Sequence, residues 1–355
     1  MLLLVAQLMG ALAILLAVLF KILIYIDGRG IGLTDIVRAM HREFVFTMAW
    51  GFKKRGPSST SGSDDESGSS LATSSNSRTT ALIKILTTLW EAILVLALVF
   101  KVILITGAGG GLGRELSVRL SARGASLALW DKDEKSLKET EIACHAEGRS
   151  PVIKCYHVDM AQRDDIARVA TATRKDFGTL DMLINNAGTG ARGKIIDQSD
   201  DDIRITLEVN AISHFWMAKE FLPGMLERDD GHIVTIASFA ALFASAQNMI
   251  PYCASKFAAL AIQEGLENET TCMGKTGLRF TTICPSYFQT KLLEGMTNKP
   301  GFTIMPLDYA ATRVIDAILT EQRIAIIPTA LYIRSAMHSR GFVFDLYFFK
   351  RYLNR

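Results

Sequence analysis

The sequence has little cysteine and an almost balanced charge, and both features narrow the function classes. The five cysteines are an odd number without closely paired spacing, which argues against a disulfide framework and against a zinc site. The net charge is only +3 over 355 residues, and the basic residues are scattered, so no nucleic-acid partner is expected. We expect a domain in a reducing, cytosol-facing compartment, with no bound metal. The length allows one α/β domain with about a hundred residues to spare.

Residues 1–26 are apolar apart from Gln7 and Lys21. That length is sufficient for a helix across the hydrocarbon core of a bilayer. A cleaved signal peptide is the alternative, but its charged start, shorter apolar region and small-residue cleavage site are not evident. Basic residues follow this run and none precedes it, so the positive-inside rule places the next segment in the cytosol. We therefore predict a transmembrane anchor at 1–26.

Residues 27–80 are first basic and then rich in serine. The part from Gly56 to Ser70 cannot bury enough apolar surface to offset the entropy of ordering. It is therefore predicted to be a disordered linker. Serines beside the acidic residues 64–66 could be kinase targets, although a solvated spacer is the simpler interpretation.

Residues 81–100 are apolar again but contain Lys84 and Glu91. A charge at the middle of a bilayer costs about 3 kcal/mol, even on the lenient insertion scale. A second span would also carry the following domain to the lumen, where unpaired cysteines are unexpected. We therefore expect a membrane-associated helix that lies in the interface or packs on the domain, with a second span as the alternative.

From Lys101 onward, short apolar runs alternate with amphipathic helical patterns, as in a parallel sheet covered on both faces. The predicted strands are 102–106, 126–130, 152–158, 180–184, 232–236, 279–284 and 323–327.

The segment 102–113 carries the first functional signal. A β-branched apolar strand ends in Gly107-Ala108-Gly109-Gly110-Gly111-Leu112-Gly113, and a helical pattern follows. Glycines allow a tight turn and a close approach of the backbone to a pyrophosphate, which the free N–H groups of the helix can hold. A glycine-rich turn alone is weak, but a strand before it and a helix after it favour nucleotide binding over an ordinary loop.

Acidic and amide residues follow the next three strands. Asp131 ends the second strand, where a carboxylate can accept hydrogen bonds from the adenosine ribose and repel a 2′-phosphate. This favours NAD over NADP, although Lys132 is adjacent, and Asp131 could instead be a turn residue. Asp159 ends the third strand and Asn185-Asn186-Ala187-Gly188 the fourth. Strand carboxyl ends are where such a sheet presents its ligand groups, but Asn-Ala-Gly would also suit a plain turn.

A serine, a tyrosine and a lysine form the catalytic constellation. Tyr252 and Lys256 are four residues apart, so they share one face if Pro251 begins a helix. A phenol has a pKa of about 10, and a nearby ammonium favours the phenolate. Ser238 follows the strand 232–236, where its hydroxyl can stabilise charge on a substrate oxygen. By spacing alone, however, a Tyr-x-x-x-Lys pair more often marks an exposed helix face.

Taken together, these motifs resemble the short-chain dehydrogenase/reductase family in order and separation over about residues 102–327. The resemblance implies a Rossmann-type, doubly wound α/β fold with a single catalytic domain at 101–330. It also implies a nicotinamide cofactor held by further residues: Thr106, Gly107, Gly111, Leu112, Gly113, Asp131, Asp159, Asn186, Ala187, Gly188, Tyr252, Lys256, Pro285 and Thr290.

In this family, the match of Asp159 contacts the adenine, and the Asn-Asn-Ala-Gly segment supports the sheet. Asn210 matches the residue that holds a water for proton relay with the lysine; its alternative is an ordinary helix kink. The matches of Pro285 and Thr290 touch the nicotinamide amide. Pairing of family members through helices implies a homodimer.

A finer resemblance points to membrane-anchored retinol dehydrogenases and 17-beta-hydroxysteroid dehydrogenases of the endoplasmic reticulum and lipid droplets. It rests on segments 129–131, 210–216, 231–234 and 252–257. It implies an NAD-dependent enzyme for a lipophilic alcohol. The region from Tyr287 to Phe302, together with the aromatic tail 331–355, could line its apolar entrance at a membrane. The equally weighted alternatives for that tail are packing in the core and a contact in a dimer. The alternative function is a non-catalytic membrane or lipid-droplet scaffold, for which a damaged Ser/Tyr/Lys set would be expected.

Overall fold

The computed structural model describes residues 101–329 and Leu331, except for residues 148, 245, 247 and 291–303. The anchor predicted at 1–26, the linker at 27–80 and the membrane-associated helix at 81–100 lie outside the described residues, as does the tail beyond Leu331. Within the described part, no helix combines the length and apolar character that a membrane span requires.

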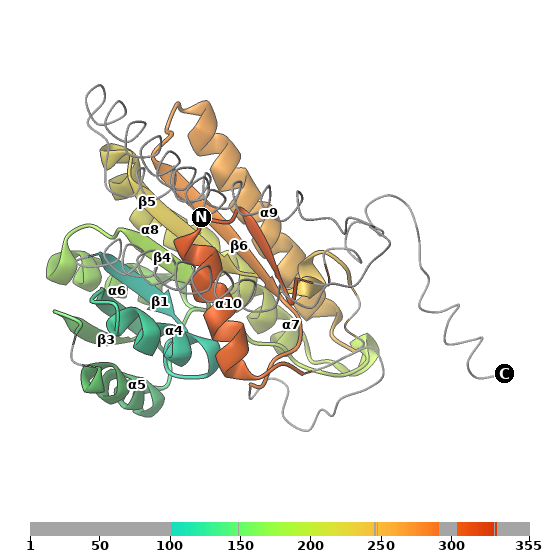
Figure 1. Ribbon diagram of the computed structural model, residues 1–355. Coiled ribbons are helices and arrows are strands. Elements are labelled where there is room, and N and C mark those ends of the chain that lie inside the picture. The colour runs from blue at the N-terminus through green and yellow to red at the C-terminus, as the bar shows by residue number, and fades with distance from the viewer. Residues whose placement is uncertain are drawn as a thin grey trace, which may run out of the picture. The chain divides into compact units, whose positions relative to one another are not determined.

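Seven strands form one fully parallel sheet (Figure 1). Their order across the sheet is β3-β2-β1-β4-β5-β6-β7. β2 and β3 are added on one side of β1, and β4 to β7 are added on its other side, so the order of strand addition reverses between β1 and β4. The predicted strands and the single Rossmann-like domain are thereby confirmed, with ends shifted by at most two residues. The strands are β1 Val102–Thr106, β2 Ser126–Asp131, β3 Ile153–His157, β4 Met182–Asn185, β5 Gly231–Ile236, β6 Leu278–Pro285 and β7 Ile324–Ile327.

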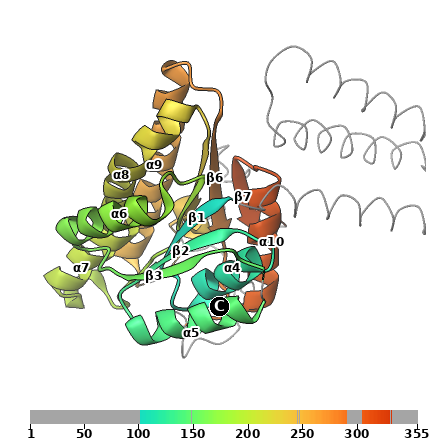
Figure 2. The ribbon, with the colours of Figure 1, turned by 90° about the vertical axis from the view of Figure 1, so that its left-hand side faces the viewer.

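Helices cover both faces of the sheet, as Figure 2 shows. On one face lie α4 (Gly111–Ser121), α5 (Glu134–Ala146) and α10 (Leu307–Leu319). On the other lie α6 (Arg163–Phe177), α8 (Ser213–Arg228) and α9 (Ile250–Cys272). Shorter elements are η1 Ile195–Asp197, α7 Asp200–Leu207, the π-helix η2 Glu208–Ile212 and the 3₁₀ turn η3 Phe239–Ala241.

The strands are apolar throughout because both of their faces are buried. In β2 the first five side chains are buried, and Trp130 is fully enclosed. Its indole N–H donates to Thr173 at 3.1 Å, and its ring meets Phe221 edge-on with centroids 5.9 Å apart. This packing fixes the end of β2, and therefore the position of the next residue, Asp131.

Candidate active site

A cavity of about 1090 Å³ lies at the carboxyl ends of the strands. This is the edge where β1 and β4, neighbours in the sheet, send their following segments to opposite faces, and open α/β sheets bind ligands at such a point. All of the predicted site residues except Thr106, Gly113 and Asn210 line the cavity. Its volume exceeds what one small ligand needs, so it can hold a dinucleotide together with a second molecule.

The glycine turn is shaped by steric demands at two positions. Gly107 has a φ of +66°, and a Cβ there would lie 2.8 Å from the Cα of Ala187. A Cβ on Gly113 would lie 2.0 Å from the carbonyl oxygen of Gly107. Helix α4 therefore starts directly against the end of β1, and no larger side chain fits between them.

The start of α4 provides the cradle that a pyrophosphate requires. Its N-cap residue, Gly110, offers no side-chain cap, and a Cβ there would meet nothing within 4 Å. The first N–H groups of the helix therefore face open cavity, where the positive end of the helix dipole favours an anion. These features fit a dinucleotide cofactor.

Thr106 ties the glycine turn to the segment after β4. Its hydroxyl oxygen accepts hydrogen bonds from the N–H groups of Asn186 and Ala187, both at 3.0 Å. The side-chain amide of Asn186 donates in return to the carbonyl of Thr106 at 2.8 Å. Thr106 thus holds the glycine turn against the segment after β4, but it does not itself line the cavity.

The two acidic residues predicted to read the adenosine lie at the cavity wall. Asp131 is oriented by two backbone groups, with Gly109 N–H donating to its Oδ2 at 2.7 Å and Asp133 N–H to its Oδ1 at 3.0 Å. Each carboxylate oxygen keeps a further lone pair for a ribose hydroxyl. Asp159 accepts from the N–H of Ala161 at 2.9 Å.

The segment after β6 closes the cavity opposite Asp131. Pro285 ends that strand, and the next N–H, of Ser286, donates to the carbonyl of Ile327 at 2.7 Å. Thr290 lies across the cavity, because its Cγ2 is 3.4 Å from the position that a Cβ of Gly111 would take. The segment therefore lies close to the start of α4, and Pro285 and Thr290 would help to hold a bound dinucleotide there.

Tyr252 and Lys256 lie one turn apart at the start of α9, which begins with Pro251 near its N-terminus. The predicted shared helix face is confirmed. The Lys256 ammonium lies 5.7 Å from the centroid of the Tyr252 ring and donates to the carbonyl of Ile236 at 2.9 Å. Lys256 is only 4% exposed, so this carbonyl is an important partner for a charge that burial would otherwise destabilise.

Ser238 follows β5 and caps the turn η3, where its oxygen accepts from the N–H of Ala240 at 3.1 Å. Its hydroxyl also lies close enough to the Tyr252 phenol to lower the pKa of that phenol. Two hydroxyl groups thus converge on the same part of the cavity. Such a pair can bind one substrate oxygen between them.

Burial dominates the titration of both groups on α9. It raises the pKa of Tyr252 to about 12, which the Ser238 hydroxyl only partly opposes. Burial lowers the pKa of Lys256 to about 8. The Lys256 ammonium lies 5.7 Å from the Tyr252 ring centroid, and burial is the largest influence on the pKa of the phenol. The expectation that the ammonium makes the phenol acidic stays a prediction.

Asn210 lies in the π-helix η2 and is completely buried. Its Oδ1 accepts from the N–H of Thr189 at 2.8 Å, and its Nδ2 donates to the carbonyl of Thr189 at 2.8 Å and to Ser255 Oγ at 2.9 Å. Both N–H groups and one lone pair of Oδ1 are therefore engaged with protein atoms. A π-bulge also alters the carbonyl hydrogen bonding of its helix, and such bulges are frequent at functional sites.

The side chains of Asn210 and Lys256 both lie close to Gly188. Asn210 Oδ1 and Lys256 Nζ both lie 3.5 Å from the position that its Cβ would take. The loop beyond it passes over the phenol, since a Cβ on Gly190 would be 3.0 Å from Tyr252 Cδ2. The fold therefore collects the four predicted catalytic residues at one place.

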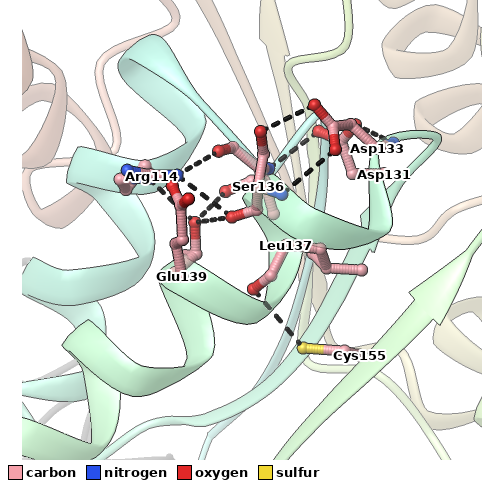
Figure 3. Close-up of polar contacts among 10 residues, drawn as sticks. Arg114, Asp131, Asp133, Ser136, Leu137, Glu139 and Cys155 are labelled. Atoms are coloured by element: carbon pink, nitrogen blue, oxygen red, sulfur yellow. Dashed lines mark hydrogen bonds and ion pairs between the residues drawn. The ribbon is translucent and has the colours of Figure 1, made fainter.

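Sequence reasoning assigned no role to several residues that the structure brings to the site. Ser255 lies within the Tyr-x-x-x-Lys motif and links it to Asn210, but a serine on a helix gives no distinct signal. Arg114 follows the glycine turn directly and donates to the carbonyl of Gly109 in that turn and to the carbonyl of Ser136 in the first turn of α5 (Figure 3). The apolar part of the wall includes Phe239, Met249, Met305 and Leu331, beside Tyr287 and Phe288 from the region that the sequence predicted at an apolar entrance.

Among the described residues, no group of three or more His, Cys, Asp or Glu side chains could hold a metal ion. The described cysteines are all free thiols. Burial raises the pKa values of Cys144 and Cys284 to about 12. Neither thiol is therefore an activated nucleophile.

The chain is similar to proteins of known family. A family model described as short chain dehydrogenase matches residues 101–301. Human 17-beta-hydroxysteroid dehydrogenase 13 is 36% identical over 236 residues, which are 66% of this chain and 76% of that protein. Mouse epidermal retinol dehydrogenase 2 is 38% identical over 235 residues, 65% of this chain and 75% of that protein.

Solved structures share the fold. A short-chain dehydrogenase/reductase from Burkholderia phymatum in complex with NAD aligns with a TM-score of 0.60 and 25% identity, covering 69% of this chain and 95% of its own. A short-chain dehydrogenase from Sphingobium yanoikuyae in complex with NADPH also gives 0.60, at 23% identity over 69% and 96% of the two chains. The second likeness shows the fold alone.

Proposed function

The chain belongs to the short-chain dehydrogenase/reductase family of oxidoreductases, which use a nicotinamide cofactor, and we propose that it interconverts a lipophilic alcohol and its carbonyl with NAD. The observation that carries the proposal is the convergence of Ser238, Tyr252, Lys256 and Asn210 beside the glycine cradle. A retinol or a hydroxysteroid is the substrate class we propose, supported by the names of the relatives and by the apolar wall of the cavity.

The preference for NAD rests on Asp131. Its carboxylate is fixed by the backbone of Gly109 and Asp133 at the cavity wall. A fixed carboxylate binds two ribose hydroxyls well and repels a phosphate on the same ribose. The cradle itself fits either nicotinamide cofactor, so the choice depends on this part of the wall.

In the oxidation direction, the hydrogen on the alcohol carbon leaves as hydride with its electron pair, and the hydroxyl proton passes to the Tyr252 oxygen. The bound nicotinamide supplies the hydride acceptor. Ser238 hydrogen-bonds the substrate oxygen throughout, and Lys256 stabilises the phenolate form of Tyr252. In reduction, the neutral phenol donates its proton to the carbonyl oxygen.

The high pKa of Tyr252 makes the resting phenol a proton donor, so oxidation requires that this proton leave first. Both N–H groups of the Asn210 amide donate to protein acceptors, Thr189 and Ser255. A water that relays the proton from Lys256 would therefore have to donate to an oxygen of Asn210, either its backbone carbonyl or the second lone pair of Oδ1.

The test is turnover of retinoids, hydroxysteroids and long-chain alcohols by membranes containing the protein, with NAD and NADP compared. Activity should be lost in Tyr252→Phe while NADH binding is retained. Full activity of this variant would reject the assigned acid/base. A wild type that binds no cofactor would instead support the scaffold alternative.

We also propose that the protein resides in the endoplasmic reticulum membrane or on lipid droplets, with its catalytic domain in the cytosol. The apolar segments 1–26 and 81–100 and the lipophilic substrate class support this.

We further propose a homodimer, supported by Phe215 on α8 and Phe257 on α9, which are exposed aromatic side chains. Protease protection in microsomes and sedimentation of the detergent-solubilised protein test the two proposals.

A further inference from the structure

The guanidinium of Arg114 is held beside the glycine turn by four acceptors. Its Nη2 donates to the carbonyl of Gly109 at 2.8 Å and to the carbonyl of Ser136 at 3.1 Å, and its Nε donates to Thr140 Oγ1 at 3.1 Å. The fourth acceptor is the Glu139 carboxylate, whose Oε2 lies 2.8 Å from Nη2 (Figure 3). A cation near the start of α4 opposes the helix dipole, so these acceptors are what keep it in place.

Glu139 is thereby linked to the residue that reads the ribose. Gly109 donates its backbone N–H to Asp131 and accepts a hydrogen bond from Arg114 at its carbonyl. The backbone of Gly109 therefore links the Asp131 side chain to the Arg114 side chain. Asp131, Arg114 and Glu139 all line the same end of the cavity. The Asp131 carboxylate itself has no ion pair with a described residue.

Arginine is the residue best suited to bind a phosphate, because its planar fork donates two parallel hydrogen bonds. In Arg114 the Nε and Nη2 groups are occupied, and a carboxylate offsets the charge. The Arg114 side chain is 34% exposed and that of Glu139 is 51% exposed, so both can be reached by a ligand in the cavity. Lys132 is a second cation at this wall.

From these contacts we propose that Glu139 is a cofactor-selectivity residue that acts through Arg114. By pairing with the guanidinium, it prevents Arg114 from binding a phosphate on the 2′ position of the adenosine ribose. Asp131 repels that phosphate directly, and Glu139 withholds a cation at the same wall that could compensate. The inference rests on the proposed use of a nicotinamide dinucleotide, and it adds a second determinant to Asp131.

The test uses two fragments that occupy only the adenosine end of the site, 2′,5′-ADP and 5′-AMP. Their dissociation constants are measured by calorimetry on the purified full chain and on Glu139→Ala, Arg114→Gln and the double variant. Glu141→Ala is the matched control, since Glu141 lies on the same helix, pairs with Lys138 and does not line the cavity. The contribution of Lys132 is the same in every variant and cancels.

In Glu139→Ala, the affinity for 2′,5′-ADP relative to 5′-AMP should rise more than about twofold and up to about fivefold, the most that one partly exposed charge pair usually contributes. The Arg114→Gln background should remove that gain, and Glu141→Ala should leave the ratio within about twofold of wild type. Because both fragments are measured on each variant, and an intact 5′-AMP affinity reports folding, a general loss of structure cannot imitate the result.

An unchanged ratio in Glu139→Ala would overturn the proposal. So would a gain that persists in the double variant, because it would show that Glu139 only repels the phosphate directly. The proposed function is judged separately, on the wild type. If the wild type prefers 2′,5′-ADP, the NAD assignment fails, whereas a preference for 5′-AMP with an unchanged ratio in Glu139→Ala rejects only the role of Glu139.

Discussion

The amide of Asn210 donates a hydrogen bond to the hydroxyl of Ser255 at 2.9 Å, and this bond joins the π-helix to the catalytic helix. Ser255 donates in turn to the carbonyl of Tyr252 at 2.7 Å. Both Asn210 and Ser255 are completely buried. The position of the catalytic turn of α9 therefore depends on a polar contact between two elements 45 residues apart in the chain.

Ser255→Ala should lower the free energy of unfolding by about 1–3 kcal/mol, because a buried donor of Asn210 loses one of its acceptors. Urea denaturation measures this loss. Turnover should fall more than cofactor affinity, since the cradle lies on other elements. Ser255→Thr, which keeps the hydroxyl, should restore most of the activity, and a fully active Ser255→Ala would show that the link is only structural.

Lys256→Met should abolish turnover while it removes a pH dependence of stability. The pKa of Lys256 is lowered to about 8 in the folded protein, so the unfolded chain binds more protons between pH 8 and the ordinary lysine value of 10.5. Across that range, wild-type stability should rise with pH relative to the variant, by up to about 1.4 kcal/mol per unit. Parallel unfolding free energies of the two proteins from pH 8 to 10 would contradict this.

His214 should make the domain sensitive to acid. It is buried, its Nδ1 atom has no hydrogen-bond partner, and burial together with the Lys256 charge lowers its pKa to about 3. The unfolded chain therefore binds the proton more readily below the ordinary pKa of 6.5, and stability should fall with decreasing pH between 6.5 and 3, by up to about 1.4 kcal/mol per unit.

The measurement for this prediction is chemical denaturation of His214→Gln between pH 4 and 7. The variant should lose part of the acid-dependent decrease that wild type shows. His145→Gln is the control, since His145 is exposed on α5. If both variants follow the wild-type curve, His214 does not contribute to acid sensitivity.

Two glycine substitutions should have opposite effects. Gly113→Ala places a Cβ 2.0 Å from the carbonyl oxygen of Gly107, so it should displace α4 from β1 and abolish NADH binding. Gly265→Ala, in the interior of α9, meets nothing within 4 Å. It should raise the free energy of unfolding by about 0.5–1 kcal/mol and leave activity unchanged. Thermal melts with and without NADH test both.

Much of the fold could be predicted from the sequence because local pattern and burial agree. Strands such as Val102–Thr106 are buried on both faces and are therefore apolar throughout, and turn residues limit them clearly. The motif spacing also predicted that Tyr252 and Lys256 share a helix face. The structure confirms both. The assignment of individual residues to chemical roles stays a prediction that the experiments above address.

The sequence by itself determined the strand–turn–helix at the glycine cradle, since no larger residue fits where Gly113 meets Gly107. It also determined which polar residues follow the strands. The tertiary structure alone decided how these groups titrate and which of them pair. Burial sets the pKa values of Tyr252 and Lys256. The pairing of Arg114 with Glu139 joins residues 25 positions apart on two helices, and no local pattern encodes such a contact.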